Sequence, residues 1–187
     1  MNTLFITTYI RKELILWFFL SFFLILNGCS SIPKTSKKWP EKVLKKLSLR
    51  EKIAQMMIYR MHLKYGDINS KKWNEINKLI SSDGIGGIHL WSGDGSSSIA
   101  FMNKFQKQSK IPIIFDADIE RGLGQRFPAG TDFPPLMAVT ATGNAKNAYD
   151  IGRIVAIESR ALGLHWNLSP VVDVNNNPLN PIINTRS

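Results

Sequence analysis

The chain has 187 residues, a formal net charge of +10 and 44% hydrophobic residues, enough for one domain with a buried core. Residues 30–80 hold thirteen Lys/Arg against four Asp/Glu, whereas residues 81–187 hold nine of each. The second part therefore lacks the basic face that a nucleic-acid-binding protein needs, and we expect no nucleic-acid partner. We interpret the basic first part as a solvated segment beside an anionic membrane or wall.

The N-terminus has the features of an export signal. Arg11 and Lys12 precede the apolar run Leu14–Leu26, which is followed by Asn, Gly and Cys29. Thirteen residues at about 1.5 Å each span roughly 20 Å, too short for a permanent transmembrane helix. The ending LNGC resembles a bacterial lipoprotein signal, in which the cysteine becomes the lipidated first residue. We predict such a signal over residues 1–28, with an ordinary signal or a short anchor as the alternative.

Cys29 is the only cysteine in the sequence. It therefore allows no intramolecular disulfide, no cysteine-based zinc site and no CxxC redox motif. A single thiol at the end of an export signal is best explained by attachment of lipid. We expect a protein anchored to the membrane through Cys29, in the bacterial cell envelope and facing the periplasm or the exterior. Residues 29–40 read as a polar tether, and residues 41–187 as the folded domain.

Helical patterns open the folded domain. Residues 41–47 have helical spacing, and Ser48 with Glu51 matches a capping box for the helix that follows. The predicted core face of that helix consists of Ile53, Met56 and Met57. A second capped helix covers residues 70–82, ends at Asp83-Gly84 and has an apolar face of Trp73, Ile76, Leu79 and Ile80.

Short apolar strands then alternate with helices. We predict strands near residues 57–61, 85–91, 113–116 and 166–171, helices over residues 99–108 and 144–162, and a long loop over residues 118–135. The second of these helices should face the core with Ala148, Ile151, Ile154, Val155 and Ile157. Such alternation predicts an α/β protein with a parallel sheet. A closed (β/α)8 barrel has eight strands and about 250 residues. Four strands therefore predict a partial TIM barrel, about its first half.

Polar residues gather where two of these strands end. Asp116 and Asp118 alternate along the strand at residues 113–116 and should share one side, with Glu120 just after them. An α/β barrel keeps its chemistry at this end of its strands. Spacing alone leaves two interpretations open: Asp118 and Glu120 are paired carboxylates that act as acid and base on a sugar, or they cap a loop.

Further polar residues accompany these acids. Arg121 and Arg126 follow in the same loop, where one of them could pair with the acids and hold them ionised. Asn167 and Asp173 lie around the strand predicted at residues 166–171, and we interpret Asp173 as a structural residue.

The segment DADIERGLGQRFPAGTDFPPLMAVTATGN resembles family 3 glycoside hydrolases, in which an Asp two residues before a Glu is followed eight residues later by an Arg. Asp118 and Arg126 occupy these places. The resemblance implies that Asp118 accepts hydrogen bonds from hydroxyls of the non-reducing terminal sugar, and that Arg126 binds the same sugar. Downstream, SPVVDVNNNPLNPIINTRS resembles the segment that ends in another sugar-binding Arg, here Arg186. The resemblance covers residues 48–187, approximately.

The resemblance implies a retaining glycosidase of terminal β-linked sugars, with β-N-acetylhexosaminides as the first choice and β-glucosides as the second. The substrate would be a β-linked oligosaccharide or a peptidoglycan-derived sugar, and no metal or cofactor is implied. Asp118 would then be a sugar ligand and not the nucleophile. The family's Lys-His pair, acid/base and nucleophile are expected beyond Ser187, so the 187-residue chain alone should be inactive. His62, His89 and His165 match no catalytic histidine, and we expect them to be packed or on the surface.

A second interpretation is a non-catalytic, membrane-tethered carbohydrate-binding module, or a gene remnant. The presence of Asp118, Arg126 and Arg186 without a nucleophile favours it. Half a barrel, however, would leave an unpaired strand edge and an exposed apolar face, which promote aggregation.

Overall fold

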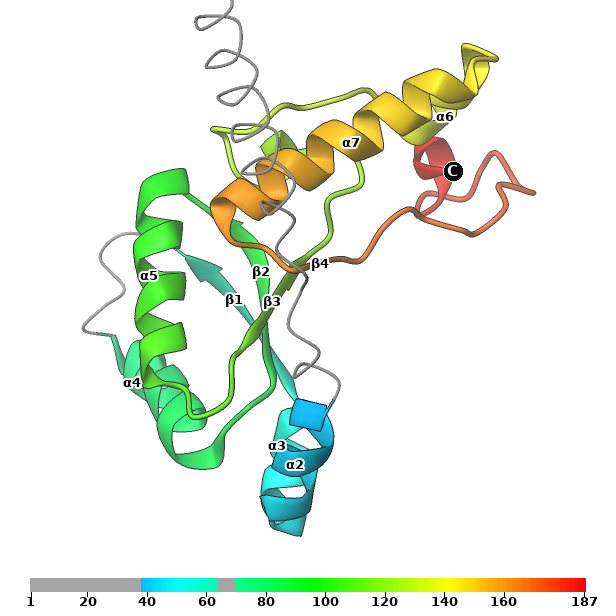
Figure 1. The fold of residues 1–187 in the computed structure, drawn as a ribbon. Helices are drawn as coiled ribbons and strands as arrows, with labels where there is room; N and C mark the ends of the chain where they lie inside the picture. The colour runs from blue at the N-terminus through cyan, green and yellow to red at the C-terminus, as the bar shows by residue number, and fades with distance from the viewer. Residues whose placement is uncertain (1–37, 64–69) are drawn as a thin grey trace, which may run out of the picture. The chain divides into compact units, whose positions relative to one another are not determined.

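The computed structural model describes residues 38–63 and 70–187 of the chain (Figure 1). The predicted signal and the lipid-attachment site at Cys29 lie outside these residues. Helix α2 (Trp39–Lys46) belongs to one compact unit, and residues Leu47–Ser187 form a second. Every residue with a predicted role in sugar binding belongs to the second unit, so its architecture positions the site.

A four-stranded parallel sheet is the centre of the second unit. Its order is β1 (Ile58–Leu63), β2 (Gly87–Gly93), β3 (Ile114–Ala117) and β4 (Trp166–Asn167). Each strand pairs in parallel with the next strand along the chain. Parallel strands need long crossover connections, and here these connections contain helices. This arrangement confirms the predicted α/β fold and the partial (β/α)8 barrel.

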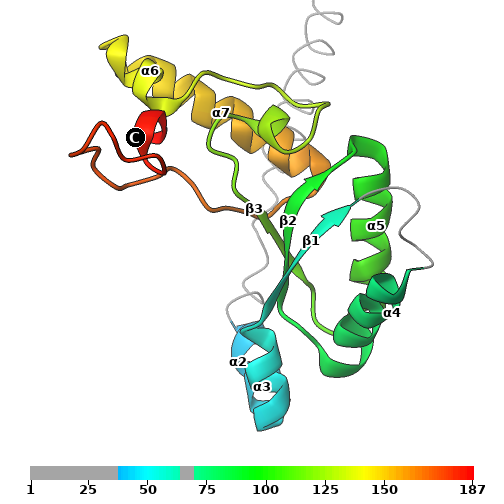
Figure 2. The ribbon, with the colours of Figure 1, turned by 180° about the vertical axis from the view of Figure 1, so that it is seen from behind.

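Helices α4 (Lys71–Lys78), α5 (Gly95–Gln108) and α7 (Ala145–Leu162) pack on one face of this sheet, which we call the outer face. Figures 1 and 2 show α4 and α5 on the same side of β1 and β2. Alternate strand residues and apolar helix residues form one core, which includes Met61, Leu63, Trp73, Ile76, Ile88, Leu90, Phe101, Phe105, Phe115, Ala117, Val155 and Leu162. The shorter elements are η3 (Leu79–Asp83), η4 (Leu123–Gln125), α6 (Leu136–Ala141) and η5 (Asn184–Arg186).

Local capping signals set the helix starts. The side chain of Ser48 accepts from the backbone N–H of Glu51, and the carboxylate of Glu51 accepts from the backbone N–H of Ser48. The capping box predicted for helix α3 (Leu49–Gln55) is therefore confirmed. Helix α5 begins earlier than predicted, because Asp94 caps it by accepting from the backbone N–H of Ser97.

The predicted apolar stripe after Ser48 is wrong. Ile53, Met56 and Met57 are predicted to face the core, yet each is more than half exposed. Helix α3 ends at Gln55, so the two methionines lie beyond it. Only Ala54 is buried on this helix. Three apolar residues at helical spacing do not form a core face when the helix ends before the last two of them.

Helix α7 confirms the prediction for residues 144–162 in its extent, but only part of its predicted inner face is buried. Its buried residues are Val155, Ser159 and Leu162, four and three positions apart. Ile157 is more than half exposed, since at 100° per residue it lies on the side opposite Val155 and Ser159. Ala148 is exposed as well. The helix ends at Gly163, which has a φ of 104° that favours glycine.

The fourth strand is shorter than the predicted range of residues 166–171, since β4 ends at Asn167. Pro170 has no backbone N–H to donate to a ladder. The hydroxyl of Ser169 instead donates to the backbone carbonyl of Ile119, at 2.8 Å. The chain therefore leaves the sheet at the point where its side chains bind the loop that follows β3.

Candidate functional site

All three residues with predicted sugar-binding roles line one cavity of about 380 Å³. Asp118 and Arg126 come from the loop after β3, and Arg186 comes from η5, near the end of the chain. Trp91, near the end of β2, and Glu120 also line this cavity. Tertiary structure thus brings together residues that are up to 95 positions apart in the sequence (91 to 186). The cavity lies at the C-terminal ends of parallel strands, as predicted.

Asp118 faces this cavity between two nitrogen-bearing side chains. Its Oδ2 lies 3.7 Å from Nη2 of Arg126 and 3.8 Å from Nε2 of His89. Both separations exceed hydrogen-bond length, so the carboxylate keeps acceptor capacity for a ligand. Arg126 is held by its Nε, which donates to the backbone carbonyl of Asp118 at 2.9 Å. Of the two arginines of this loop, Arg126 is thus the one beside the carboxylate of Asp118.

Trp91 supports the guanidinium of Arg126. The Cζ atom of Arg126 lies 4.2 Å from the centroid of the Trp91 ring, and that of Arg60 lies 3.7 Å from it. Cation–π attraction of this kind orients a planar guanidinium without using its N–H donors. Arg126 therefore retains donors for a ligand. Arg121, the other arginine of the loop, lies 3.8 Å from Asp132 instead.

Glu120 is held by Arg186 in a bidentate pair. Nε and Nη2 of Arg186 donate to its two carboxylate oxygens at 2.9 and 2.6 Å. The hydrogen bonds from Arg186 and the charges of nearby arginines lower the pKa of Glu120, against the effect of burial. An ionised carboxylate engaged in this way is unsuited to be a general acid. The geometry therefore favours a structural role for Glu120 over a catalytic pair with Asp118.

Arg186 also keeps some donor capacity. Besides its bonds to Glu120, its Nη1 donates to the backbone carbonyl of Ile182 at 3.3 Å. A guanidinium has five N–H groups, so two remain, and the side chain is 44% exposed. This geometry is compatible with the predicted contact between Arg186 and a sugar.

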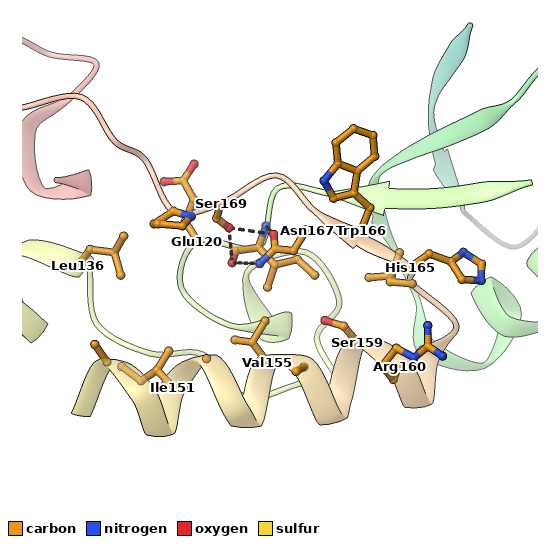
Figure 3. Close-up of a pocket in the computed structure, with 16 residues that line it drawn as sticks. Glu120, Leu136, Ile151, Val155, Ser159, Arg160, His165, Trp166, Asn167 and Ser169 are labelled. Atoms are coloured by element: carbon orange, nitrogen blue, oxygen red, sulfur yellow. Dashed lines mark hydrogen bonds between the residues drawn. The ribbon is translucent and has the colours of Figure 1, made fainter. Parts of the chain in front are cut away.

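The end of β4 fixes the residue between Asp118 and Glu120 (Figure 3). Asn167 accepts from the backbone N–H of Ile119 at 3.0 Å and donates to its carbonyl at 3.2 Å. Ser169 donates to the same carbonyl. Beside these bonds, a cavity of about 420 Å³ runs along α7 and is lined mainly by aliphatic side chains. We do not assign this second cavity to sugar binding, because the predicted ligands Asp118 and Arg126 do not line it.

The loop after β3 needs glycine at one position in particular. Gly122 has a φ of 98°, and a Cβ there would overlap the backbone carbonyl of Thr131. The side chain of Gln125 accepts from the backbone N–H groups of Glu120 and Arg121, at 2.9 and 3.0 Å. These contacts fold the loop back on itself and hold Glu120 in place for Arg186.

The contact between His89 on β2 and Asp116 on β3 was not predicted from the sequence. His89 Nδ1 lies 2.5 Å from Asp116 Oδ1, and Asp116 is fully buried. Burial raises the pKa of Asp116, and the hydrogen bond from His89 opposes this shift. His89 is packed, as predicted, but it packs against carboxylates. The parallel register, which pairs His89 with Asp116, is the signal that could have revealed the contact.

The other two histidines have structural partners. His62 Nδ1 lies 2.8 Å from the hydroxyl of Ser92, and His165 Nδ1 accepts from the backbone N–H of Phe115 at 3.1 Å. Burial lowers the pKa of His165. Over residues 38–63 and 70–187, no three His, Cys, Asp or Glu side chains are arranged to hold a metal ion.

Comparisons with known proteins agree with this architecture. A beta-N-acetylglucosaminidase/beta-glucosidase of Cellulomonas fimi is 32% identical over 103 residues, which are 55% of this chain and 18% of that protein. Beta-hexosaminidase A of Pseudoalteromonas piscicida is 32% identical over 126 residues, 60% of this chain and 21% of that protein. A solved structure of the beta-glucoside phosphorylase BglX bound to 2FGlc superposes with a TM-score of 0.72 and 27% identity, over 83% of this chain and 27% of that one.

The chain thus spans about a fifth of the two curated relatives and about a quarter of the matched structure. Residues 48–187 match the model of the glycosyl hydrolase family 3 N terminal domain. This range includes all four strands of the sheet and every residue of the cavity described above. The chain therefore belongs to glycosyl hydrolase family 3, as a part of its N-terminal barrel domain.

Proposed function

We propose that this chain supplies the sugar-binding part of the active site of a retaining glycosidase that removes terminal β-linked sugars. One observation carries the proposal: the carboxylate of Asp118 faces a cavity between Arg126 and His89 without a direct hydrogen bond to either. A sugar hydroxyl can donate to a carboxylate and accept from a guanidinium at the same time. Such charge-assisted bonds are the strong ones, and they suit an uncharged polyhydroxylated ligand.

Asp118 acts as a ligand in this proposal and not as the nucleophile. A retaining glycosidase needs two carboxyl groups about 5–5.5 Å apart, one as nucleophile and one as acid/base. Here Asp116 is buried behind His89, and Glu120 is bound by Arg186. Asp118 itself lies between two nitrogen-bearing side chains. We therefore assign no catalytic carboxylate to this cluster.

The proposed substrate is the terminal sugar of a β-linked oligosaccharide or of a peptidoglycan fragment. The names of the relatives support β-N-acetylhexosaminides as the first choice and β-glucosides as the second. No metal or cofactor is part of this proposal. A carbohydrate-binding module without catalysis is the second candidate, and it is favoured because Asp116 and Glu120 are already bound by His89 and Arg186.

We also propose that the protein is anchored to the cell envelope through lipid on Cys29. Among the residues that the structure describes, no helix has the length and apolar character to cross a membrane. The proposal rests on the LNGC ending of the apolar N-terminal run. Labelled fatty acid should enter the wild-type protein and not the Cys29→Ser variant. Equal labelling of both would contradict the anchor.

Asp118→Asn tests the sugar-binding role, since it removes the charge and keeps the shape of the side chain. We expect the 187-residue chain to bind N-acetylglucosamine or glucose in calorimetry, and the variant to bind about 10- to 100-fold more weakly, in keeping with loss of a charge-assisted hydrogen bond. Asp132→Asn is the matched control, because Asp132 lies in the same loop but outside the cavity. Equal affinity of wild type and Asp118→Asn would contradict the proposal.

A further inference from the structure

The two ring nitrogens of His89 have different surroundings. Nδ1 lies 2.5 Å from Oδ1 of Asp116. A carboxylate oxygen accepts, so Nδ1 carries the proton and donates. Nε2 points to the opposite side, toward Asp118, and makes no hydrogen bond with any residue in the described part of the chain. The histidine thus has one nitrogen committed to a buried partner and one directed at the cavity's proposed sugar ligand.

Asp116 is well placed to hold this ring. Its side chain is fully buried on β3, directly beside His89 in the parallel register. Its second oxygen, Oδ2, has no hydrogen-bond partner within the described residues, so His89 is its one described contact of this kind. A buried carboxylate with a single donor binds that donor strongly, because loss of the bond would leave the charge uncompensated. The orientation of the His89 ring is therefore set by Asp116.

Two nitrogen atoms lie at similar distances from Oδ2 of Asp118. Arg126 Nη2 lies 3.7 Å away and His89 Nε2 lies 3.8 Å away. Each gap is too long for a direct hydrogen bond. One hydroxyl can accept from Arg126 and donate to Asp118, at about 2.8 Å each, whereas Nε2 and Asp118 both accept and therefore need separate hydroxyls. Among the other charged groups, Arg186 interacts electrostatically with Asp118, and Arg60 stacks on Trp91 together with Arg126.

We propose that His89 is a further sugar-binding residue, whose Nε2 accepts from a sugar hydroxyl adjacent to the one that donates to Asp118, and that Asp116 is the positioning residue that aims the ring. The sugar would thus be held by two adjacent hydroxyls, one that donates to Asp118 and accepts from Arg126, and one that donates to Nε2 of His89. This inference rests on the proposed sugar-binding function. It adds a ligand from strand β2 to the ligands Asp118 and Arg126 of the loop after β3.

The test measures binding of N-acetylglucosamine and glucose to the 187-residue chain by calorimetry. His89→Asn should weaken binding about 3- to 10-fold, the value of one hydrogen bond. His62→Asn is the matched control: it removes an exposed histidine from the neighbouring strand β1, and affinity should not change. Asp116→Leu should weaken binding as much as His89→Asn, whereas Asp116→Asn, which keeps an acceptor for Nδ1, should restore most of it.

A measurement on the wild-type chain guards against variants that fail to fold. In ¹⁵N NMR spectra of the imidazoles, addition of sugar should shift Nε2 of His89 and leave His62 unchanged. If sugar binds, Asp118→Asn loses it, and neither His89→Asn nor the Nε2 signal responds, the inference is wrong while the proposed function stands. If the wild-type chain binds neither sugar, the proposed function fails and the inference fails with it.

Discussion

The two faces of the sheet contrast sharply in chemistry, although the same strands build both. The outer face, against α4, α5 and α7, carries apolar side chains such as Ile88 and Phe115, which are fully buried. The inner face carries Arg60, His89 and Asp116 on the alternate positions. Because strand side chains alternate, one segment can supply core and site together. The contrast implies that stability depends mainly on the outer face, whereas the proposed sugar contact of His89 belongs to the inner face.

A core substitution should give the largest effect. Phe105 of α5 is fully buried and contacts Trp73, with ring centroids 5.0 Å apart. Phe105→Ala removes this packing and leaves a cavity, so the free energy of unfolding should fall by about 3–5 kcal/mol. Urea denaturation measures the change. The exposed Ile99 on the same helix provides the control, and Ile99→Ala should cost much less. Similar losses for the two variants would contradict the outer face as the source of stability.

Loss of the Glu120–Arg186 pair should have a smaller effect on the free energy of unfolding, and this effect should depend on pH in the acidic range. The pKa of Glu120 is lowered from its ordinary value of 4.5 in the folded state, chiefly by its hydrogen bonds to Arg186. The pair's contribution to stability is therefore complete above pH 4.5 and is lost as the pH falls through the lowered pKa. Unfolding measured from pH 7 to pH 3 should show a steeper loss for the wild type than for Glu120→Gln. Glu75→Gln, on α4, should follow the wild-type curve, and parallel curves for wild type and Glu120→Gln would exclude this role.

Loss of a helix cap should give the smallest effect. Ser48→Ala removes the hydroxyl that accepts from the backbone N–H of Glu51, at an exposed helix start. We expect a loss of about 1 kcal/mol in the free energy of unfolding and no change in sugar affinity. Ser96→Ala, in the exposed first turn of α5, serves as the control and should be close to neutral. A change in sugar affinity for Ser48→Ala would contradict the hypothesis that stability and sugar binding depend on different residues.

Much of the fold could be predicted because its signals are local. The capping box at Ser48, the helix end at Gly163 and the four apolar strand segments each depend on residues within a few positions. The prediction for Ile53, Met56 and Met57 was wrong because periodicity gives an apolar stripe but not the point where the helix ends. Asp118, Arg126 and Arg186 were selected by resemblance, and the structure places them around one cavity.

The sequence by itself determined which segments become strands and helices, the family, and the candidate ligands of the loop after β3. Only the tertiary structure decided their partners. His89 and Asp116 are 27 positions apart, and Glu120 and Arg186 are 66 apart. Periodicity and capping act within about four residues, whereas such pairs depend on strand register and on the path of long loops. That is the physical reason why Glu120 could be read as a catalytic acid, and why His89 showed its place beside Asp118 only in the folded chain.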